Sequence, residues 1–225
     1  MILVTGGLSG IGAAIVSHLR HTQSDRVLTL GRSPSDSSDH YQCDVSSYTE
    51  LKAVYSVLSS KSTRLSALIN CAGIASMNLA LTTPADVTHR IISTNLLGTI
   101  YSTQVFAPLL IRNKSGRIIN FSTIAVKIGL AGESVYVASK AGVEAFSRTI
   151  ANELAPFNIT VNCLAPGPIN TPLLSGLNES QIARVVSHQI IKKQFTAHDI
   201  SDLVSMILSS QSSSITGHTF NIGGF

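Results

Sequence analysis

Short apolar segments alternate with amphipathic segments along the whole chain, and this alternation restricts the folds that it can adopt. The apolar segments have the length of strands, and the segments between them carry apolar side chains at helical spacing. The predicted strands are residues 2–5, 26–30, 41–45, 65–70, the start of 117–140, 159–164 and 219–222, and the predicted helices are 11–21, 48–58, 84–113, 134–156 and 199–209. Without a linker or an internal repeat, this order predicts one α/β domain over residues 1–225, with a doubly wound parallel sheet of about seven strands and helices on both faces.

The composition indicates a globular protein and is compatible with assembly into oligomers. Hydrophobic residues make up 44% of the 225 residues and charged residues only 12%. Much of the surface is therefore either covered by Ser, Thr, Asn and Gln side chains or buried against other subunits. The net charge of +4 comes without a run of Lys or Arg, so the sequence indicates neither a nucleic-acid surface nor a membrane surface.

Cysteine usage and the N-terminal segment point to a reducing compartment. Cys43, Cys71 and Cys163 are odd in number and lack the paired spacing of a metal site or a disulfide framework. Each lies in or beside an apolar segment, which predicts buried free thiols, and we expect no metal centre. The segment MILVTGG enters a strand without a basic n-region, and no apolar run reaches spanning length. We therefore expect a soluble cytoplasmic protein.

A glycine-rich turn joins the first predicted strand to the first predicted helix. Gly6, Gly10 and Gly12 follow Thr5 in the pattern Thr-Gly-x-x-x-Gly-x-Gly. Small residues let the backbone approach a ligand, and a helix N-terminus offers N–H groups and its positive dipole end to a phosphate. The pattern favours a dinucleotide site. An ordinary tight turn is the alternative, because the spacing differs from G-x-G-x-x-G.

The second predicted strand ends in Gly31 and Arg32. An acidic residue at this position usually binds the ribose hydroxyls of NAD, whereas an arginine accommodates the 2′-phosphate of NADP. The sequence therefore favours NADP(H) over NAD(H). A solvated loop arginine is the alternative.

Tyr136 and Lys140 lie four residues apart in a predicted helix, so their side chains share one face. A free tyrosine, with a pKa of about 10, is a poor acid or base near neutral pH. A neighbouring ammonium favours the phenolate and lowers that pKa. The pair predicts a tyrosine that exchanges a proton with a substrate oxygen, and a chance pair on an amphipathic turn is the alternative.

Polar or small residues also end the other predicted strands, at the edge where a doubly wound sheet binds its ligands. These residues are Asp44, Asn70, Thr123 and Pro166. Asn95 interrupts the apolar face of 84–113, and it is either a satisfied structural amide or part of a polar network near the chemistry. Residues 170–194 have weak periodicity and several polar side chains, which predicts a mobile lid over the pocket.

Taken together, these motifs resemble the short-chain dehydrogenase/reductase family over essentially the whole chain. The matching positions are Thr5, Gly6, Gly10, Gly12, Asp44, Asn70, Ala72, Gly73, Asn95, Tyr136, Lys140, Pro166, Gly167, Thr171, 215–217, Gly223 and Gly224. The order of the motifs, residues 195–200 and the tail are most similar to the oligomeric subgroup that includes 3-oxoacyl-[acyl-carrier-protein] reductases. The resemblance implies a Rossmann fold, an NAD(P)-dependent enzyme, a small carbonyl or alcohol substrate, and dimers or tetramers formed through the helices 84–113 and 134–156.

The resemblance also implies roles for individual residues. Tyr136 would give a proton to the substrate carbonyl oxygen as hydride arrives from the nicotinamide. Lys140 would lower the pKa of that tyrosine and bind the nicotinamide ribose, and Asn95 would hold a water that relays protons to Lys140. Besides Tyr136 and Lys140, the residues expected to bind the cofactor are Gly6, Leu8, Ser9, Gly10, Ile11, Gly12, Gly31, Arg32, Asp44, Val45, Asn70, Ala72, Gly73, Pro166, Gly167, Ile169 and Thr171.

The chain departs from the family pattern at two positions. The family's usual serine, thirteen residues before the tyrosine, is Thr123 here. Threonine keeps the hydroxyl and adds a methyl group, so we expect an active enzyme with a narrower pocket. The adjacent Ser122 should point to the opposite side and not replace it. Ser9 stands where many NADP-using relatives have a basic residue.

The sequence therefore favours an NADP(H)-dependent reductase of a ketone or a 3-oxoacyl thioester. One alternative is an alcohol or sugar dehydrogenase that uses NAD(P) and the same residues. The other is a non-catalytic protein that senses NADP(H), against which the presence of Asn95, Tyr136 and Lys140 argues. Lys127 and His188 are expected to be surface residues.

Overall fold

The computed structural model describes residues 1–174, 176 and 178–225. In this part of the chain, seven strands form one sheet in the order β3-β2-β1-β4-β5-β6-β7, and every neighbouring pair is parallel. The strands are β1 (Ile2–Thr5), β2 (Val27–Gly31), β3 (His40–Gln42), β4 (Ala67–Asn70), β5 (Gly116–Phe121), β6 (Ile159–Ala165) and β7 (Thr219–Asn221). The predicted doubly wound parallel sheet is confirmed, and its third strand is shorter than predicted.

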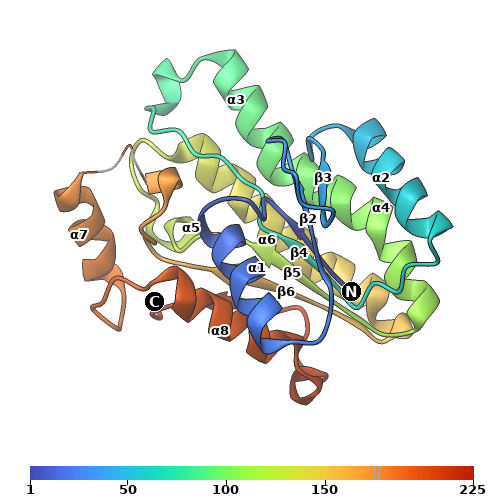
Figure 1. Ribbon diagram of the computed structural model, residues 1–225. Coiled ribbons are helices and arrows are strands. Elements are labelled where there is room, and N and C mark those ends of the chain that lie inside the picture. Colours follow the sequence, from blue (N-terminus) through green and yellow to red (C-terminus); the bar gives the residue numbers. More distant parts are fainter. Residues whose placement is uncertain (175, 177) are drawn as a thin grey trace.

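Helices cover both faces of the sheet, as Figure 1 shows. The described α-helices are α1 (Gly10–Thr22), α2 (Tyr48–Ser60), α3 (Ala85–Ile92), α4 (Gly98–Asn113), α5 (Ala125–Ile128), α6 (Ser134–Leu154), α7 (Glu179–His188) and α8 (Ala197–Leu208). A π-helical turn, η2 (Ser93–Leu97), lies between α3 and α4, and short 3₁₀ turns are η1 (Ala80–Thr82), η3 (Ala155–Phe157), η4 (Pro172–Leu174) and η5 (Ser210–Ser212).

Two hydrophobic cores hold the layers together. On one face, β-strand side chains pack against α2, α4 and α6 around the fully buried Phe106. On the other face they pack against α1 and α8, which lie side by side. Strands buried on both faces carry apolar side chains at consecutive positions, and this explains why the apolar segments of the sequence predicted the strands well.

The prediction of one uninterrupted helix over residues 84–113 is wrong, because the π-helical turn η2 separates α3 from α4. Asn95 lies in this turn, where its Oδ1 accepts a hydrogen bond from the N–H of Ile74 (2.8 Å) and its Nδ2 donates to the carbonyl of Ile74 (2.9 Å). Turns of this kind occur within α-helices where a residue must be re-aimed. Here the wider turn presents Asn95 to the segment that follows β4.

The predicted lid, residues 170–194, contains η4 and helix α7. Ser175 and Leu177, which belong to that prediction, lie outside the described residues. Helix α7 begins with a complete capping box between Asn178 and Gln181, which explains a helix in a segment whose apolar periodicity is weak. Whether the segment moves as a lid stays a prediction.

The backbones of β1, α1 and the segment after β4 approach one another closely at the glycine-rich turn. A Cβ atom at Gly12 would lie 2.2 Å from the carbonyl oxygen of Gly6. A Cβ atom at Gly6, whose φ is +69°, would lie 2.9 Å from Cα of Ala72. These neighbours are backbone atoms, so a change of rotamer would not relieve either clash.

We expect Gly12→Ala to lower the free energy of unfolding by about 1–3 kcal/mol, at the upper end of that range because the clash is with backbone. Gly31→Ala is the matched control, because a Cβ atom there meets only the His40 ring at 3.5 Å, an ordinary contact. Chemical denaturation without cofactor measures both variants. Equal stabilities for the two variants would contradict the proposed close approach.

Candidate active site

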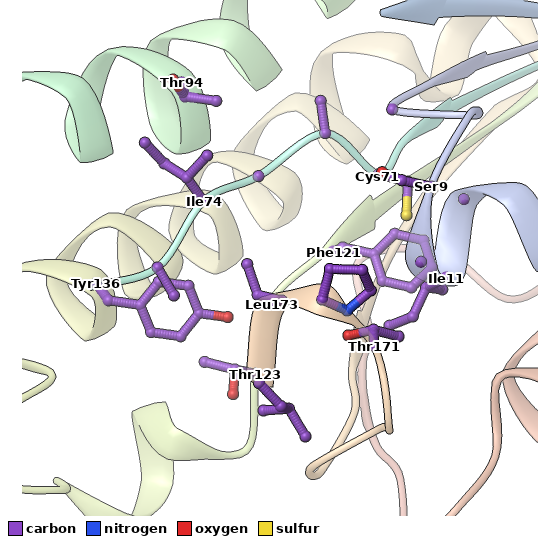
Figure 2. A pocket seen from close by; sticks show the side chains of 18 of the residues that line it. Ser9, Ile11, Cys71, Ile74, Thr94, Phe121, Thr123, Tyr136, Thr171 and Leu173 are labelled. Carbon is purple, nitrogen blue, oxygen red and sulfur yellow. The ribbon is translucent and has the colours of Figure 1, made fainter. Parts of the chain in front are cut away.

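A cleft of about 650 Å³ opens along the carboxyl ends of the strands. Figure 2 shows side chains from β5, from the segment after β4 and from the segment after β6 converging on it. Nearly all of the site residues predicted from the sequence line the cleft, namely Gly6, Leu8, Ser9, Gly10, Ile11, Gly12, Gly31, Arg32, Asp44, Val45, Ala72, Gly73, Thr123, Tyr136, Lys140, Pro166, Gly167, Ile169 and Thr171. Asn70 and Asn95 are not among the lining residues.

One end of the cleft offers an unobstructed helix N-terminus. Ser9 is the N-cap of α1 but makes no side-chain capping hydrogen bond, so the first N–H groups of the helix have no side-chain partner there. Gly10 has a φ of +52° and lies beside Thr171. Free N–H groups, the positive end of the helix dipole and the lack of side chains suit a phosphate group.

Arg32 and Asp44 lie at the ends of β2 and β3. Arg32 is exposed, and among the described residues no carboxylate forms an ion pair with it. The Asp44 carboxylate accepts hydrogen bonds from the N–H (2.9 Å) and the hydroxyl (2.7 Å) of Ser46, which hold it in place. An unpaired guanidinium suits an additional phosphate. Together with the bare helix N-terminus, these residues fit a dinucleotide.

Tyr136 reaches into the cleft beside Thr123, as Figure 2 shows. The side chain is buried, with 8% of its surface exposed. Burial raises the pKa of Tyr136 above its ordinary value, the nearby Glu133 raises it further, and a hydrogen bond with Thr123 opposes these two effects. The phenol therefore keeps its proton in this structure.

The Lys140 ammonium is buried and has a main-chain partner, and its effect on the pKa of Tyr136 stays a prediction. The Nζ atom of Lys140 donates a hydrogen bond to the carbonyl of Phe121 (2.8 Å), and burial lowers the pKa of the ammonium. The raised pKa of Tyr136 is set by burial and Glu133. A Cβ atom at Gly73 would lie 3.4 Å from Nζ, so the lysine borders the cleft next to a residue without a side chain.

Ser122 and Thr123 point in different directions, as the alternation of strand side chains predicts. The Ser122 hydroxyl is buried and donates to Oε1 of Glu144 (2.7 Å). Thr123, in contrast, lies beside Tyr136. The hydroxyl that faces the tyrosine is therefore that of Thr123, and Ser122 does not take its place.

Asn70 and Asn95 belong to buried polar networks rather than to the lining of the cleft. Asn70 Nδ2 donates to Oδ1 of Asn120 (2.8 Å) and to the hydroxyl of Thr103 (3.2 Å), so its side chain is turned into the protein, and a contact between Asn70 and the cofactor stays a prediction. Asn95 Nδ2 also donates to the hydroxyl of Ser139 (3.0 Å). The amide of Asn95 thus has protein partners at both its oxygen and its nitrogen, and its part in a proton relay stays a prediction.

Glu133 was not identified from the sequence, although it lines the cleft directly beside Tyr136. It is the N-cap residue of α6 and is 9% exposed. Burial raises the pKa of its carboxyl group. A position three residues before the tyrosine lies on the same helical face, and this spacing was the signal available in the sequence.

Two further expectations can be compared with the structure. The three cysteines are free thiols, Cys43 and Cys163 are buried, and Cys71 is half-buried and borders the cleft. Burial raises the pKa of the Cys71 thiol to about 12. In the described part of the chain, no helix is both long and apolar enough to cross a membrane.

Comparison with known proteins decides the family. A family model described as "Enoyl-(Acyl carrier protein) reductase" matches residues 7–224. The 3-oxoacyl-[acyl-carrier-protein] reductase FabG of Chlamydia pneumoniae is 32% identical over 235 residues, which cover 99% of this chain and 95% of that protein. The chain belongs to the short-chain dehydrogenase/reductase family. It is therefore an NAD(P)-dependent oxidoreductase, and the predicted class is confirmed.

Other relatives show the breadth of this family. Nodulation protein G of Rhizobium meliloti is 31% identical over 231 residues, covering 99% of this chain and 94% of that protein. Among solved structures, the ligand-free aldohexose dehydrogenase of Thermoplasma acidophilum superimposes with a TM-score of 0.88 at 27% identity, covering 99% of this chain and 92% of that one. Relatives of similar likeness thus carry different names, so likeness alone does not choose a substrate.

We expect Glu133→Gln to stabilise the protein at neutral pH. The pKa of Glu133 is higher in the folded protein than in the unfolded chain, where a glutamate has a pKa of about 4.3. The free energy of unfolding of the wild type therefore falls as the pH rises from the pKa in the unfolded chain through the pKa in the folded protein. The gain of the variant should therefore disappear below about pH 4. Loss of the neighbouring charge should also lower the pKa of Tyr136.

Denaturation curves at several pH values and an ultraviolet tyrosine titration measure the two effects, with Tyr136→Phe as the reference for the titration. Glu153→Gln, an exposed change near the other end of α6, is the control. If Glu133→Gln behaved like this control in both measurements, Glu133 would not be the buried carboxyl group that raises the pKa of Tyr136.

Proposed function

We propose that this protein is an NADP(H)-dependent reductase that converts a ketone or a 3-oxoacyl thioester to the hydroxy compound, with Tyr136 as general acid. The observation that carries the proposal is a buried tyrosine beside a second hydroxyl, that of Thr123, in a cleft whose lining suits a dinucleotide. The likeness to the FabG protein of Chlamydia pneumoniae supports the choice of substrate class.

The nicotinamide cofactor, when bound, supplies the hydride, and the protein supplies orientation and the proton. Tyr136 holds its proton because its pKa is raised. Reduction of a carbonyl group creates an alkoxide, which is far more basic than a phenolate, so proton transfer from Tyr136 is favourable. The Thr123 hydroxyl offers a second hydrogen bond to the same oxygen and orients the substrate.

Lys140 is expected to act on the phenolate that forms when Tyr136 gives up its proton. Its ammonium is buried, with 5% of the residue exposed, and borders the cleft next to Gly73. A phenolate formed at Tyr136 is a new negative charge in this poorly solvated site, and a nearby ammonium stabilises it. We propose that Lys140 acts at this stage and that it also binds the nicotinamide ribose.

The preference for NADP(H) rests on Arg32. The guanidinium follows Gly31 at the end of β2, borders the cleft and is free of an acidic partner among the described residues. A guanidinium recognises a phosphate through charge-assisted hydrogen bonds.

We also propose that residues 170–194 close over the substrate and that the protein is a cytoplasmic homo-oligomer.

A sugar dehydrogenase is the second candidate, and Glu133 is the observation that favours it. A carboxyl group beside Tyr136 can accept hydrogen bonds from substrate hydroxyls. The aldohexose dehydrogenase of Thermoplasma acidophilum is similar in structure. The second function would replace the first if the protein oxidised an aldohexose with NADP or NAD and did not reduce a 3-oxoacyl thioester. The rate of aldohexose oxidation should then be lower in Glu133→Gln.

Replacing Tyr136 with Phe should lower kcat by about 10²–10⁴-fold, because the variant lacks only the proton donor. The dissociation constant for NADPH should stay within about twofold, since the ring is kept. Steady-state kinetics and fluorescence titration measure the two quantities. Turnover at the wild-type rate would rule out Tyr136 as the general acid.

Replacing Arg32 with Ala should weaken NADPH binding by about 10–100-fold, the loss of about 1.5–3 kcal/mol in hydrogen bonds to a charged group. NADH binding should be unchanged, because NADH has no 2′-phosphate. Arg112→Ala, which removes an exposed arginine near the end of α4, is the control for net charge. Equal affinities for NADPH and NADH in the wild type would contradict the preference.

A further inference from the structure

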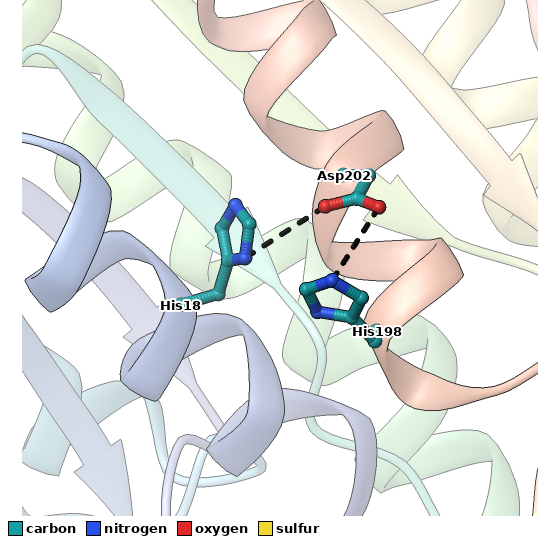
Figure 3. A group of neighbouring side chains, drawn as sticks. All are labelled: His18, His198 and Asp202. Carbon is teal, nitrogen blue, oxygen red and sulfur yellow. Dashed lines mark ion pairs between the residues drawn. The ribbon is translucent and has the colours of Figure 1, made fainter.

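Three metal-ligating side chains meet on the surface formed by α1 and α8, away from the cleft. They are His18 of α1 and His198 and Asp202 of α8 (Figure 3). None of these residues lines the cleft, and the reductase chemistry proposed above does not use them. The sequence alone indicated no metal centre, because 180 residues separate His18 from His198.

The donor atoms of the three residues point toward one another. Nδ1 of His18 lies 3.8 Å from Oδ1 of Asp202, and Nε2 of His198 lies 3.7 Å from Oδ2 of the same carboxylate. One donor atom from each residue can be chosen so that all three lie within 4.8 Å of one another. Two imidazole nitrogens and one carboxylate oxygen therefore surround a common point between the two helices.

These distances are close to those of a zinc site. Zinc binds histidine nitrogen and carboxylate oxygen at about 2.0–2.2 Å, so tetrahedral ligands are about 3.3–3.5 Å apart. The observed donors, which lie within 4.8 Å of one another, need to approach by at most about 1.3–1.5 Å to reach that separation. His198 and Asp202 have side chains that are 74% and 58% exposed, so small rotations of both can provide this movement.

His18 is the fixed member of the cluster. Its side chain is only 14% exposed, and its ring packs edge-on against that of His198 with the ring centres 5.4 Å apart. In two other histidines, Nδ1 lies within hydrogen-bond distance of a main-chain carbonyl of the same helix, at 2.6 Å for His21 and 2.8 Å for His188. In the described part of the chain, Nδ1 of His18 faces Asp202 instead.

We propose that His18, His198 and Asp202 form a binding site for a divalent transition-metal ion, with Zn²⁺ as the expected occupant. Imidazole and carboxylate together suit Zn²⁺, whereas Mg²⁺ and Ca²⁺ prefer oxygen ligands alone. Three protein ligands leave a fourth position for water.

Bound metal would connect α1 to α8. The N-terminus of α1 forms the phosphate end of the cleft, so the ion would hold in place the helix on which that end is built. The ion would act on the stability of the helix pair and not on the proton chemistry of Tyr136. A ligand that binds only the folded state raises its stability with the logarithm of the ratio of free ligand to Kd.

Calorimetric titration of the untagged, chelator-treated full-length protein with Zn²⁺ tests the proposal. We expect one saturable site, with affinity lowered at least tenfold by His198→Ala and by Asp202→Asn. His188→Ala, which removes an exposed histidine from α7, should bind Zn²⁺ like the wild type. Zn²⁺ should also raise the melting temperature of the wild type and of His188→Ala, but not that of His198→Ala.

Binding of Co²⁺ gives an independent readout, because coordinated histidine alters its visible absorption spectrum. The spectrum should change in the wild type and in His188→Ala and stay that of the free ion in Asp202→Asn. The His198 side chain is exposed, so we expect His198→Ala to fold. The test therefore does not depend on a variant of the more buried His18. Equal Zn²⁺ affinity in the wild type, His198→Ala and Asp202→Asn, or no saturable binding, would overturn the proposal.

Discussion

The hydrogen bonds of Asn95 are the interaction on which the geometry of the cleft depends. One buried amide binds both main-chain groups of Ile74, in the segment after β4, and also the hydroxyl of Ser139 on α6. Ser139 in turn donates to the carbonyl of Tyr136 (2.6 Å). A buried amide must be satisfied by such partners, so the strand exit, the π-helical turn and the helix that carries the tyrosine fix one another's positions.

A second set of buried hydrogen bonds runs from Asn95 along helix α4 into the sheet. The carbonyl of Asn95 accepts from Thr99, the carbonyl of Thr99 accepts from Thr103, and Thr103 accepts from Asn70. Asn70 and Asn120 connect the neighbouring strands β4 and β5. Buried hydrogen bonds of this kind favour one arrangement of the elements that they join, although Oδ1 of Asn70 has no partner among the described residues. The helices α4 and α6 are therefore held to the sheet directly below the cleft.

The electrostatics of the cleft follow from this burial. Tyr136 and Lys140 are both removed from water, and burial disfavours the charged form of each, so it raises the pKa of the tyrosine and lowers that of the lysine. Glu133 adds to the effect on the tyrosine. Such a site favours the neutral form of the phenol.

The sequence by itself determined the order of the strands and helices and the glycine-rich turn, because these depend on local periodicity and on residue types close in the chain. The alternation of strands with helices also predicted the parallel sheet, because a helical crossover joins parallel strands. It also placed Tyr136 and Thr123 correctly, since strand alternation and helical spacing set their directions. Only the tertiary structure decided the π-helical turn, the burial of Asn70, the burial that raises the pKa of Tyr136, and the meeting of His18 with Asp202. Each of these depends on which residues distant in sequence are brought together, and residue spacing along the chain does not encode that.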